Sequence, residues 1–413
     1  MIPTKKIWLM LFLMMFMILG GGWYFFFDEE INTNEPMYIM QTITEKSTNA
    51  RTITWQTKKS ELPQTVVYYA ENTTEKKSIK AEPKELTTSA EEMSVYTVTL
   101  NDLIPNTLYF YKVGSEGKWS QWHSLKTEDS PNNQVKAIIF GDSQSEKYEV
   151  WEKTAQVAWQ KNDNANFFIN MGDLVDIGSD YNQWKSWIHG AGTMITDIPV
   201  ASLSGNHENY LPGGTFTPAY LYKQIIHLPQ NGPTNLKGQV YSFDYGNCHF
   251  VMLDSQLQEL ENFQPELIKD QIKWLEEDLK NTKKEWKIVL IHRPLFINDK
   301  SGKLNALGKS FIPIIDKYHV DVVFSAHIHT YGRSLPLYKG TIAKQPEQGT
   351  MYISTGRSGD KTWAEAKQKH FEPMFDNSLD QPNYLVLEGE KGKLKVTGYR
   401  QDGTLIDKIE LNK

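Results

Sequence analysis

Five apolar runs in this 413-residue chain end in a side chain that could coordinate a metal ion. The side chains are Asp, Asn and His, which offer carboxylate oxygens, an amide oxygen and imidazole nitrogens. A glycine precedes three of them, which allows a sharp turn and a close approach of backbone to ligand. The runs, with the polar residues that end them, are Ile138–Asp142, Asn170–Asp173, Leu203–Glu208, Val289–His292 and Val323–His329.

These fragments are informative because all five lie at the ends of predicted strands. Alone, a Gly-Asp pair is usually a turn, an Asn-His pair a surface loop, and a His-x-His a pair of strand residues. Ligands of α/β sheets, however, bind outside the carboxyl ends of the strands, so five such ends would point Asp, Asn and His side chains into one crevice. This donor set suits Zn, Mn or Fe better than Ca or Cu(I). The joint pattern therefore predicts a metal centre.

Composition limits the alternatives. Hydrophobic residues make up 39% and charged residues 23% of the chain, which excludes a wholly disordered protein. Lys and Arg number 44 against 50 Asp and Glu, a net charge of −6 that argues against a general nucleic-acid binder. The single cysteine, Cys248, excludes an intramolecular disulfide framework and a Cys-based zinc site.

The N-terminal thirty residues have the pattern of a membrane segment. An uncharged run from Ile7 to Phe27 would span about 31 Å as a helix, enough to cross a bilayer. Lys5 and Lys6 precede it and acidic residues follow, so we expect a single-pass anchor with the remaining chain outside the cell. The alternative is a signal peptide cleaved after Gly22, which would leave a secreted protein.

Residues 36–127 read as a β-sandwich, because short strand patterns alternate with turn-rich segments. The candidate strands are Met37–Thr44, Arg51–Gln56, Thr65–Ala70, Ser94–Leu100, Thr107–Val113 and Trp122–Leu125. The segment Leu103–Val113 resembles the corner of fibronectin type III domains, in which a tyrosine, here Tyr109, bonds back to the upstream backbone.

After a polar linker, residues 135–413 change to an α/β pattern, in which apolar runs alternate with helical stretches. The candidate strands are Val135–Phe140, Phe167–Met171, Val200–Leu203, Phe250–Leu253, Ile288–Ile291 and Val320–Phe324, followed by closing strands Tyr384–Gly389 and Lys393–Tyr399. The candidate helices are Tyr148–Lys161, Gln183–Ile195, Gln264–Leu279 and Lys309–Tyr318. The segment Tyr331–Pro382 shows no clear element. The expected domains are thus a cytoplasmic tip with a transmembrane anchor (1–30), a β-sandwich (36–127) and a catalytic domain (135–413).

The ordered motifs resemble those of the calcineurin-like metallophosphoesterases, and more closely the purple-acid-phosphatase branch. The motifs that carry this resemblance are Gly141-Asp142, Gly172-Asp173, Gly205-Asn206-His207-Glu208, His292, His327-x-His329-x-Tyr331-x-Arg333 and Tyr241 to Val251. A fibronectin-like domain ahead of the catalytic one also fits that branch. The resemblance implies an α/β/β/α catalytic domain that follows the all-β sandwich.

The resemblance also implies two metal ions per chain, with the roles carried over residue by residue. Asp173 would bridge the ions. The first ion would take Asp142 and His329, and the second Asn206, His292 and His327. His207 would lie beside the substrate as general acid or phosphate ligand, and Arg333 and Asn206 are further candidate substrate contacts.

Two positions depart from the family pattern. Gln144 stands where many members have His, and Asp176 stands where purple acid phosphatases have the metal-binding Tyr. Both are candidate ligands of the first ion: Gln144 offers an amide oxygen, whereas Asp176 could ligate or orient a ligand.

The function predicted from these residues is hydrolysis of phosphate monoesters by metal-activated water outside the cytoplasm, with two divalent Mn, Zn or Fe ions. One alternative is phosphodiester hydrolysis at the same site. Another is a non-catalytic surface-binding protein with a degraded metal site. The expected partners are a phosphorylated small molecule or surface substrate and, through the N-terminal helix, the membrane; no nucleic acid is expected.

Overall fold

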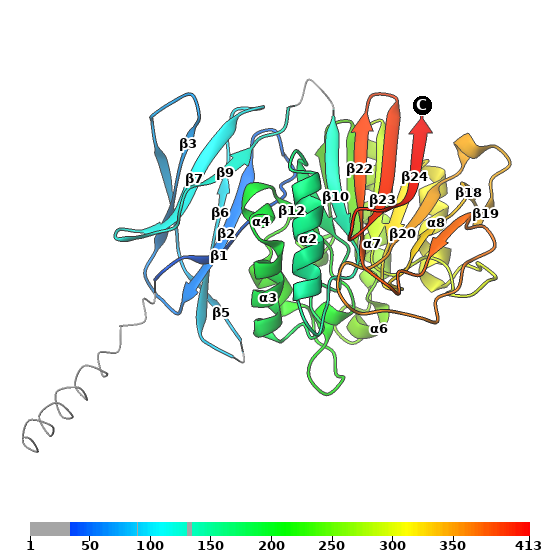
Figure 1. Cartoon of the computed structure of the whole chain (residues 1–413), viewed down its shortest axis with the longest axis horizontal. Helices are drawn as coiled ribbons and strands as arrows, with labels where there is room; N and C mark the ends of the chain where they lie inside the picture. Colours follow the sequence, from blue (N-terminus) through cyan, green and yellow to red (C-terminus); the bar gives the residue numbers. More distant parts are fainter. Residues whose placement is uncertain (1–33, 89, 130–133) are drawn as a thin grey trace, which may run out of the picture.

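The computed structural model describes residues 34–88, 90–129 and 134–413. A β-sandwich comes first, at the left in Figure 1, and an α/β domain follows it. The predicted anchor at residues 7–27 lies outside the described residues. Within the described part of the chain, no helix combines the length and the apolar character that crossing a bilayer requires.

The sandwich consists of two antiparallel sheets around a core that contains the stacked rings of Trp55 and Tyr96. Its inner sheet contains β1 (Met37–Thr42), β2 (Arg51–Lys58), β6 (Met93–Leu100) and β5 (Lys84–Leu86). Its outer sheet contains β4 (Lys77–Ala81), β3 (Gln64–Ala70), β7 (Leu108–Ser115), β8 (Lys118–Trp119) and β9 (His123–Lys126). All six predicted strands are confirmed; the three missed strands, β4, β5 and β8, are short.

The predicted tyrosine corner is confirmed. The backbone N–H of Ile104 donates a hydrogen bond of 2.8 Å to the Tyr109 hydroxyl, which is the upstream backbone contact that the sequence predicted. This bond fixes the turn that leads into β7.

The inner sheet of the sandwich continues into the α/β domain. Strand β1 pairs in parallel with β12, with Thr42 opposite Val200, so one ten-stranded sheet runs through both parts. The Tyr111 hydroxyl on β7 also donates to the carbonyl of Thr196, 3.0 Å away in the α/β domain. The sandwich is therefore joined to the α/β domain by backbone and side-chain hydrogen bonds as well as by the linker.

The α/β domain has two sheets and helices on both sides. The α/β part of the first sheet contains β10 (Val135–Phe140), β11 (Phe167–Asn170), β12 (Val200–Ser202), β22 (Asn383–Glu390), β23 (Lys393–Arg400) and β24 (Leu405–Asn412). The second contains β13 (Tyr241–Tyr245), β14 (Cys248–Leu253), β15 (Trp286–Ile291), β16 (Val322–Ser325), β20 (Met351–Thr355), β17 (Tyr331–Arg333) and β21 (Met374–Asp376). Strands β18 (Leu337–Tyr338) and β19 (Thr341–Ile342) form a separate pair.

The helices are α2 (Glu149–Lys161), α3 (Tyr181–Ala191), α4 (Met194–Asp197), α5 (Tyr220–Ile225), α6 (Leu257–Leu260), α7 (Leu267–Asn281) and α8 (Ala306–Lys317). Short 3₁₀ turns span His207–Asn209, Thr234–Leu236 and Pro346–Gln348. Each predicted helix is present, although the predicted Gln183–Ile195 is divided between α3 and α4.

Alternation along the strands of the second sheet creates the layers. Phe250 and Met252 on β14 join the core that the second sheet shares with the first sheet and α2. Their neighbours Val251 and Leu253 point the other way, into a second core built with α7 and α8. Because successive side chains of a strand face opposite sides, this alternation places helix, sheet, sheet and helix in four layers. The expected four-layered architecture is confirmed.

One buried histidine outside the predicted centre is held between two carboxylates. His249 Nδ1 lies 2.7 Å from Asp244 Oδ1, and its Nε2 lies 2.8 Å from Asp278 Oδ2. Burial lowers the pKa of this imidazole, but the two carboxylates outweigh burial and raise it to about 9. Both ring nitrogens thus donate, and the charged form is the one that the fold stabilises.

We expect His249→Gln to destabilise the fold in a pH-dependent manner. Because the pKa of His249 is higher in the folded than in the unfolded protein, its stabilisation of the fold is complete below about pH 6.5 and is lost as the pH rises towards 9. The free energy of unfolding that depends on this group is at most about 3 kcal/mol. Urea unfolding at pH 6 and pH 9.5 measures this effect. The stability gap between wild type and variant should narrow at the higher pH, whereas a gap of constant size would contradict the prediction. His189→Gln, at an exposed position on α3, is the matched control.

Candidate metal centre

The strand ends bring the predicted ligands together. Asp142, Asp173 and Asn206 follow β10, β11 and β12 of the first sheet, and His292, His327 and His329 follow β15 and β16 of the second. Ligand atoms of Asp142, Asp173 and His329 lie within 4.8 Å of one another, as do those of Asp173, His292 and His327. Asp173 belongs to both groups, which is the arrangement that a bridging carboxylate requires.

Asn206 completes the second group. Its Oδ1 lies 3.2 Å from His292 Nε2, and that nitrogen also lies 3.2 Å from Asp173 Oδ2. On the first group's side, His329 Nε2 lies 3.6 Å from Asp142 Oδ1. The six residues predicted as core ligands thus converge as two overlapping donor sets; that they ligate metal stays a prediction.

The backbone is strained at this centre. Asp173, His327 and His329 have φ values of 53°, 71° and 53°, a region that side chains other than glycine seldom adopt. Neighbouring glycines permit the close packing: a Cβ on Gly205 would lie 2.0 Å from Asp173 Oδ1. Strain of this kind persists where the surrounding structure enforces it, and it is characteristic of functional sites.

Backbone carbonyls orient two of the imidazoles. His292 donates through Nδ1 to the carbonyl of Met171 at 2.8 Å, and His329 donates through Nδ1 to the carbonyl of Lys361 at 3.0 Å. Each Nε2 therefore carries the lone pair when the ring is neutral, and it faces the carboxylates. Such outer hydrogen bonds fix the tautomer and ring orientation of metal-binding histidines.

The electrostatics of the centre favour a bound cation. Burial raises the pKa of Asp142 well above its usual range, and the charge of Asp173 adds to the effect. Burial and the charge of His292 lower the pKa of His327 to about 3, and burial lowers that of His329 to about 4. The neutral imidazoles of His327 and His329 are in the protonation state that a metal ion takes as a ligand. Burial lowers the pKa of His292, but Asp173 and Asp142 outweigh burial and raise it to about 9, so an ion bound there would displace a proton from this ring.

Gln144 supplies a further observation that fits a metal. Its side chain is buried beside Asp173, with Nε2 donating to Asp173 Oδ2 at 3.3 Å. Its Oε1 is buried and has no hydrogen-bond partner among the described residues. A buried oxygen without a partner is costly, and a cation or its bound water at the first group would satisfy it. The residues present therefore fit a metal pair.

Asp176 lies beside His207 and orients it. Asp176 Oδ1 lies 3.2 Å from His207 Nδ1 and 2.8 Å from Lys361 Nζ. The backbone carbonyl of Asp176 also accepts from His207 Nδ1 at 2.7 Å. The bond to His207 lowers the pKa of Asp176 to about 2, and Lys361 contributes to the effect. Of its two predicted roles, Asp176 has the geometry of the orienting one.

His207 has its remaining nitrogen towards the centre. Its Nε2 lies 4.0 Å from Asp173 Oδ2, and its backbone N–H donates to Asp173 Oδ1 at 2.9 Å. Burial lowers the pKa of this ring, but Asp173 and Asp176 outweigh burial and raise it to about 9. The protonated ring can thus donate a hydrogen bond or a proton to a group bound beside the two donor sets.

Two arginines near the motifs form ion pairs with carboxylates. Arg333 binds Asp407 on β24 through Nε at 2.5 Å, and the Tyr331 hydroxyl donates to the same carboxylate at 2.9 Å. This ion pair ties the Arg333 guanidinium to β24, and its predicted contact with substrate stays a prediction. Arg293 forms a two-point pair with Glu259, with contacts of 2.9 and 2.7 Å.

Sequence reasoning missed the main role of Glu208. This buried carboxylate accepts from the backbone N–H groups of Asp173 at 2.8 Å, Leu174 at 2.7 Å and Gly205 at 2.6 Å. It thereby fixes the loops that carry Asp173 and Asn206. Burial, with the nearby Asp173, raises its pKa to about 7. Its position directly after His207 was the available signal, but the sequence did not reveal the loop that it would bind.

Two aromatic rings at the centre were also missed. Trp363 packs edge-on against His327, with ring centroids 5.5 Å apart, although it comes from the segment without a clear sequence pattern. The Tyr210 ring packs at a tilt of 44° against His207, with ring centroids 4.6 Å apart, and its hydroxyl accepts from Asn206 Nδ2 at 3.0 Å. These rings add apolar surface beside the polar donors.

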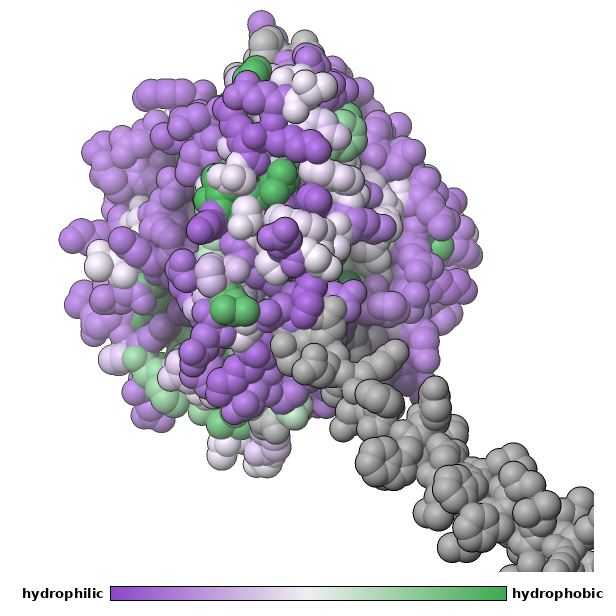
Figure 2. Space-filling model, turned by 90° about the vertical axis from the view of Figure 1, so that its left-hand side faces the viewer, coloured by the Kyte–Doolittle hydropathy of each residue, from purple (hydrophilic) through white to green (hydrophobic). Residues whose placement is uncertain are grey.

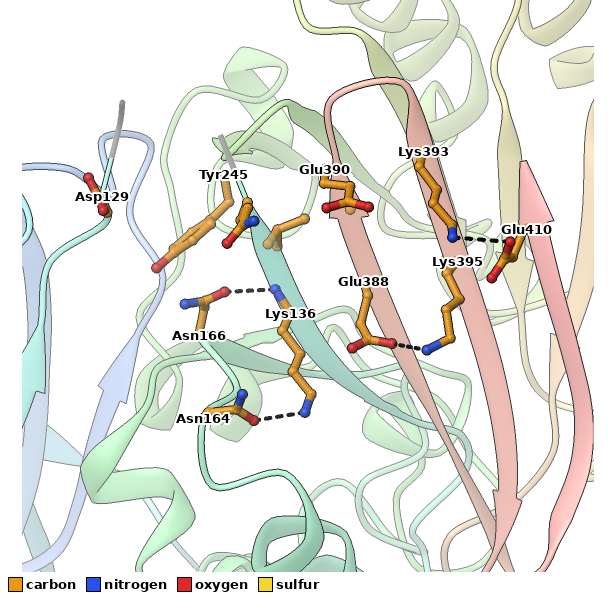
Figure 3. Close-up of a pocket in the computed structure, with 13 residues that line it drawn as sticks. Asp129, Lys136, Asn164, Asn166, Tyr245, Glu388, Glu390, Lys393, Lys395 and Glu410 are labelled. Atoms are coloured by element: carbon orange, nitrogen blue, oxygen red, sulfur yellow. Dashed lines mark hydrogen bonds and ion pairs between the residues drawn. The ribbon is translucent and has the colours of Figure 1, made fainter. Parts of the chain in front are cut away.

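A polar hollow of about 480 Å³ lies elsewhere and lacks this chemistry (Figure 3). Val135, at the opposite end of β10 from Asp142, lines it. Its three lysines have partners within the hollow: Lys136 donates to Asn164, Lys395 pairs with Glu388, and Lys393 pairs with Glu410. The converged ligand residues are therefore the better candidate for the active site.

Comparison with known proteins agrees with this geometry. Residues 135–331 match the family described as calcineurin-like phosphoesterase, and residues 36–127 match the purple acid phosphatase N-terminal domain. Purple acid phosphatase 21 of Arabidopsis thaliana is 28% identical over 275 residues, covering 65% of this chain and 59% of that protein. The Fe(3+)-Zn(2+) purple acid phosphatase 12 of the same plant is 25% identical over 320 residues, covering 73% and 65%.

Among solved structures, a purple acid phosphatase from yellow lupin (Lupinus luteus) seeds superposes with a TM-score of 0.78 at 20% identity, covering 92% of this chain and 75% of that one. This likeness shows a shared fold. The chain spans less than two thirds of the length of either Arabidopsis relative. It carries a calcineurin-like phosphoesterase domain behind a purple acid phosphatase N-terminal domain.

Proposed function

We propose that this chain, with its calcineurin-like phosphoesterase domain, hydrolyses phosphate monoesters at a dinuclear metal centre. The observation that carries the proposal is the pair of donor groups that share Asp173, with His207 beside them. Metal ions bound there would lower the pKa of a water molecule and neutralise charge on a phosphoryl group.

The residues of the chain would position the substrate and move a proton. The first donor group would hold one ion through Asp142, His329 and Asp173, and the second would hold the other through Asn206, His292 and His327. His207 would donate to the ester oxygen, because Asp176 fixes its Nδ1 and leaves its Nε2 towards the centre. Lys361 keeps Asp176 in place through the 2.8 Å ion pair.

The donor set favours Mn, Zn or Fe, because it mixes carboxylate, imidazole and amide oxygen. The test loads the purified chain with each metal separately and offers it nitrophenyl phosphate and bis(nitrophenyl) phosphate, with a chelator-treated sample as control. We expect two ions per chain and faster turnover of the monoester. Faster turnover of the diester would replace the monoester proposal, and a two-metal chain inactive on both esters would favour a binding protein.

We expect the iron-loaded protein to lack the purple band. In the purple acid phosphatases that band arises from charge transfer between a tyrosine phenolate and ferric iron, and Asp176 occupies the place of that tyrosine. A carboxylate has no comparable low-energy transition. Two other tyrosines are committed elsewhere, since the Tyr331 hydroxyl binds Asp407 and the Tyr181 hydroxyl binds Gln56. The measurement is the visible spectrum of the Fe(III)-loaded chain.

A variant that gains the purple band would test the same assignment in the opposite direction. Asp176→Tyr should create the band in the iron-loaded protein if position 176 lies next to the first ion. A strong band in the wild type would contradict the prediction, and its loss in Tyr331→Phe or Tyr210→Phe would then identify the phenolate. Tyr210 is included because its hydroxyl contacts Asn206.

We also propose that the catalytic domain lies outside the cytoplasm and is held at the cell membrane by residues 7–27. The uncharged run and the lysines before it support this location. Sedimentation with membranes should require residues 1–30. Release into the medium of a chain that lacks residues 1–22 would support instead the alternative of a cleaved signal peptide.

A further inference from the structure

The outer sheet of the sandwich carries aromatic side chains on its solvent face. Strand register places them together: Tyr69 on β3 lies opposite Phe110 on β7, and Trp119 on β8 lies opposite Gly114 of β7. Trp122 lies directly before β9, and it and Trp119 are 39% and 37% exposed. We call Tyr69, Phe110, Trp119 and Trp122 the aromatic face. Figure 2 views the molecule from this side, and green and white residues gather in the middle of the face among purple ones.

The aromatic face is one connected surface. The ring of Tyr69 lies 5.4 Å from that of Phe110 and 5.2 Å from that of Trp122. Lys112 connects the two tryptophans, because its Nζ lies 4.3 Å from the ring centroid of Trp119 and 5.2 Å from that of Trp122. The four rings, with Lys112 between Trp119 and Trp122, therefore form one strip on the sheet.

These rings add little to the core of the domain. On the same strands, the alternate residues Tyr68, Tyr111 and Val113 point inwards and are buried in the sandwich core. The outward rings remain partly in water, although large aromatic side chains are usually placed where burial stabilises them. Cross-strand ring pairs add some stability to a sheet, but this does not account for the two exposed tryptophans.

The aromatic face is surrounded by basic residues, whereas the chain as a whole has a negative net charge. The outward strand positions include Lys80 and Lys112, and Lys76 lies 5.4 Å from the ring centroid of Trp122. No outward position of β3, β4, β7, β8 or β9 in the described structure carries a carboxylate. Acidic residues next to these strands, Glu71, Glu75, Glu82 and Glu116, lie in the connections rather than in the strands. A chain with a net charge of −6 thus presents lysines between exposed rings.

We propose that the aromatic face binds an acidic polysaccharide. A sugar ring has an apolar face of C–H groups that lies flat on an aromatic ring while its hydroxyls stay in water. Several rings in a strip would hold successive sugars of a polymer, and the lysines would pair with its anionic groups. Tyr and Trp held on strands lose little conformational freedom when they bind.

The position of this face fits such a role. The inner sheet of the sandwich continues into the α/β domain through β1 and β12, and β3 and β7 of the outer sheet lie on the far side of the sandwich in Figure 1, although Tyr111 on β7 and the strand β9 contact α4. A polymer on the aromatic face would leave the candidate metal centre open. The sandwich would then hold the chain on a polysaccharide independently of what the metal centre does.

Affinity electrophoresis of the full chain tests the proposal. The probes are polygalacturonate and a phosphodiester-bearing mannan as acidic polymers and dextran as a neutral one. We expect retardation by at least one acidic polymer and weaker retardation at higher salt. Trp122→Ala and Tyr69→Ala should each weaken binding about tenfold. Lys112→Gln should weaken it less, and Phe263→Ala, an exposed ring elsewhere, should leave it unchanged.

Unchanged melting temperatures would show that the variants remain folded. The proposal is overturned if neither acidic polymer binds, if Trp122→Ala binds as well as wild type, or if dextran binds equally. It is also overturned if oligo-dT or phosphatidylserine vesicles bind more tightly than both acidic polymers, because the surface would then suit a nucleic acid or a membrane.

Discussion

Replacing Asp173 with alanine should lower phosphatase turnover by about 10³-fold or more and leave fewer than two metal ions per chain. Asp173 is the residue that both donor groups share, and it is 1% exposed. Its Oδ2 lies 3.2 Å from His292 Nε2, and its Oδ1 accepts from the backbone of His207. The substitution therefore removes a ligand from each proposed ion and loosens the loop that carries the general acid.

A second substitution separates charge from packing. Asp173→Asn keeps the side-chain shape and an oxygen for the His207 N–H, so a large loss of metal in this variant would be due to the lost charge. Asp163→Asn is the matched control, because Asp163 is exposed and lies before β11 rather than after it. Metal content by mass spectrometry and turnover of nitrophenyl phosphate are the two measurements. Two bound ions with full activity in Asp173→Ala would contradict the shared-ligand assignment.

The convergence of the six core residues could be predicted because it depends on a general property of α/β sheets. Asp142, Asp173 and Asn206 each follow a buried strand, and the parallel pairing of β10, β11 and β12 brings these ends to one edge. The strands were recognisable from apolar runs bounded by turns. The partners around the site, by contrast, depend on contacts between distant segments, which no local pattern contains.

Two examples show this limit. Arg333 was expected near substrate because it follows the histidine motif, yet it binds Asp407, 74 residues further along the chain. That carboxylate lies on β24, a strand whose alternating exposed and half-buried residues gave no clear apolar run. Trp363 reaches His327 from a segment rich in turns, where neither periodicity nor a family motif predicted a contact.

The division into domains was easier to predict than their connection. Turn-rich strands before residue 127 and the α/β alternation after 135 indicated two units, and both folds are present. That one sheet runs through both depends on a short parallel pairing, Thr42 with Val200, between strands that are far apart in sequence. Neither strand carries a signal for its partner, because strand formation depends on neighbours that a strand's own sequence does not identify.

Replacing His207 with alanine should lower turnover by about 10²–10⁴-fold while both metal ions remain bound. The ring is not a member of either donor group, and its Nε2 lies 4.0 Å from Asp173 Oδ2. Its Nδ1 is committed to the carbonyl of Asp176, so Nε2 is the nitrogen that can reach an ester oxygen. Removing a proton donor raises the barrier for bond cleavage and leaves the ligands of the metals in place.

The leaving group distinguishes the two predicted roles of His207. A general acid matters most when the departing oxygen is strongly basic, so His207→Ala should lose far more activity on an alkyl phosphate than on nitrophenyl phosphate. A residue that only holds the phosphoryl group would affect both substrates to a similar degree, and equal losses would assign His207 that role instead. His189→Ala on α3 controls for the loss of an exposed imidazole. Because the Asp176 carboxylate and carbonyl fix the ring, Asp176→Asn should show the same dependence on leaving group with a smaller loss.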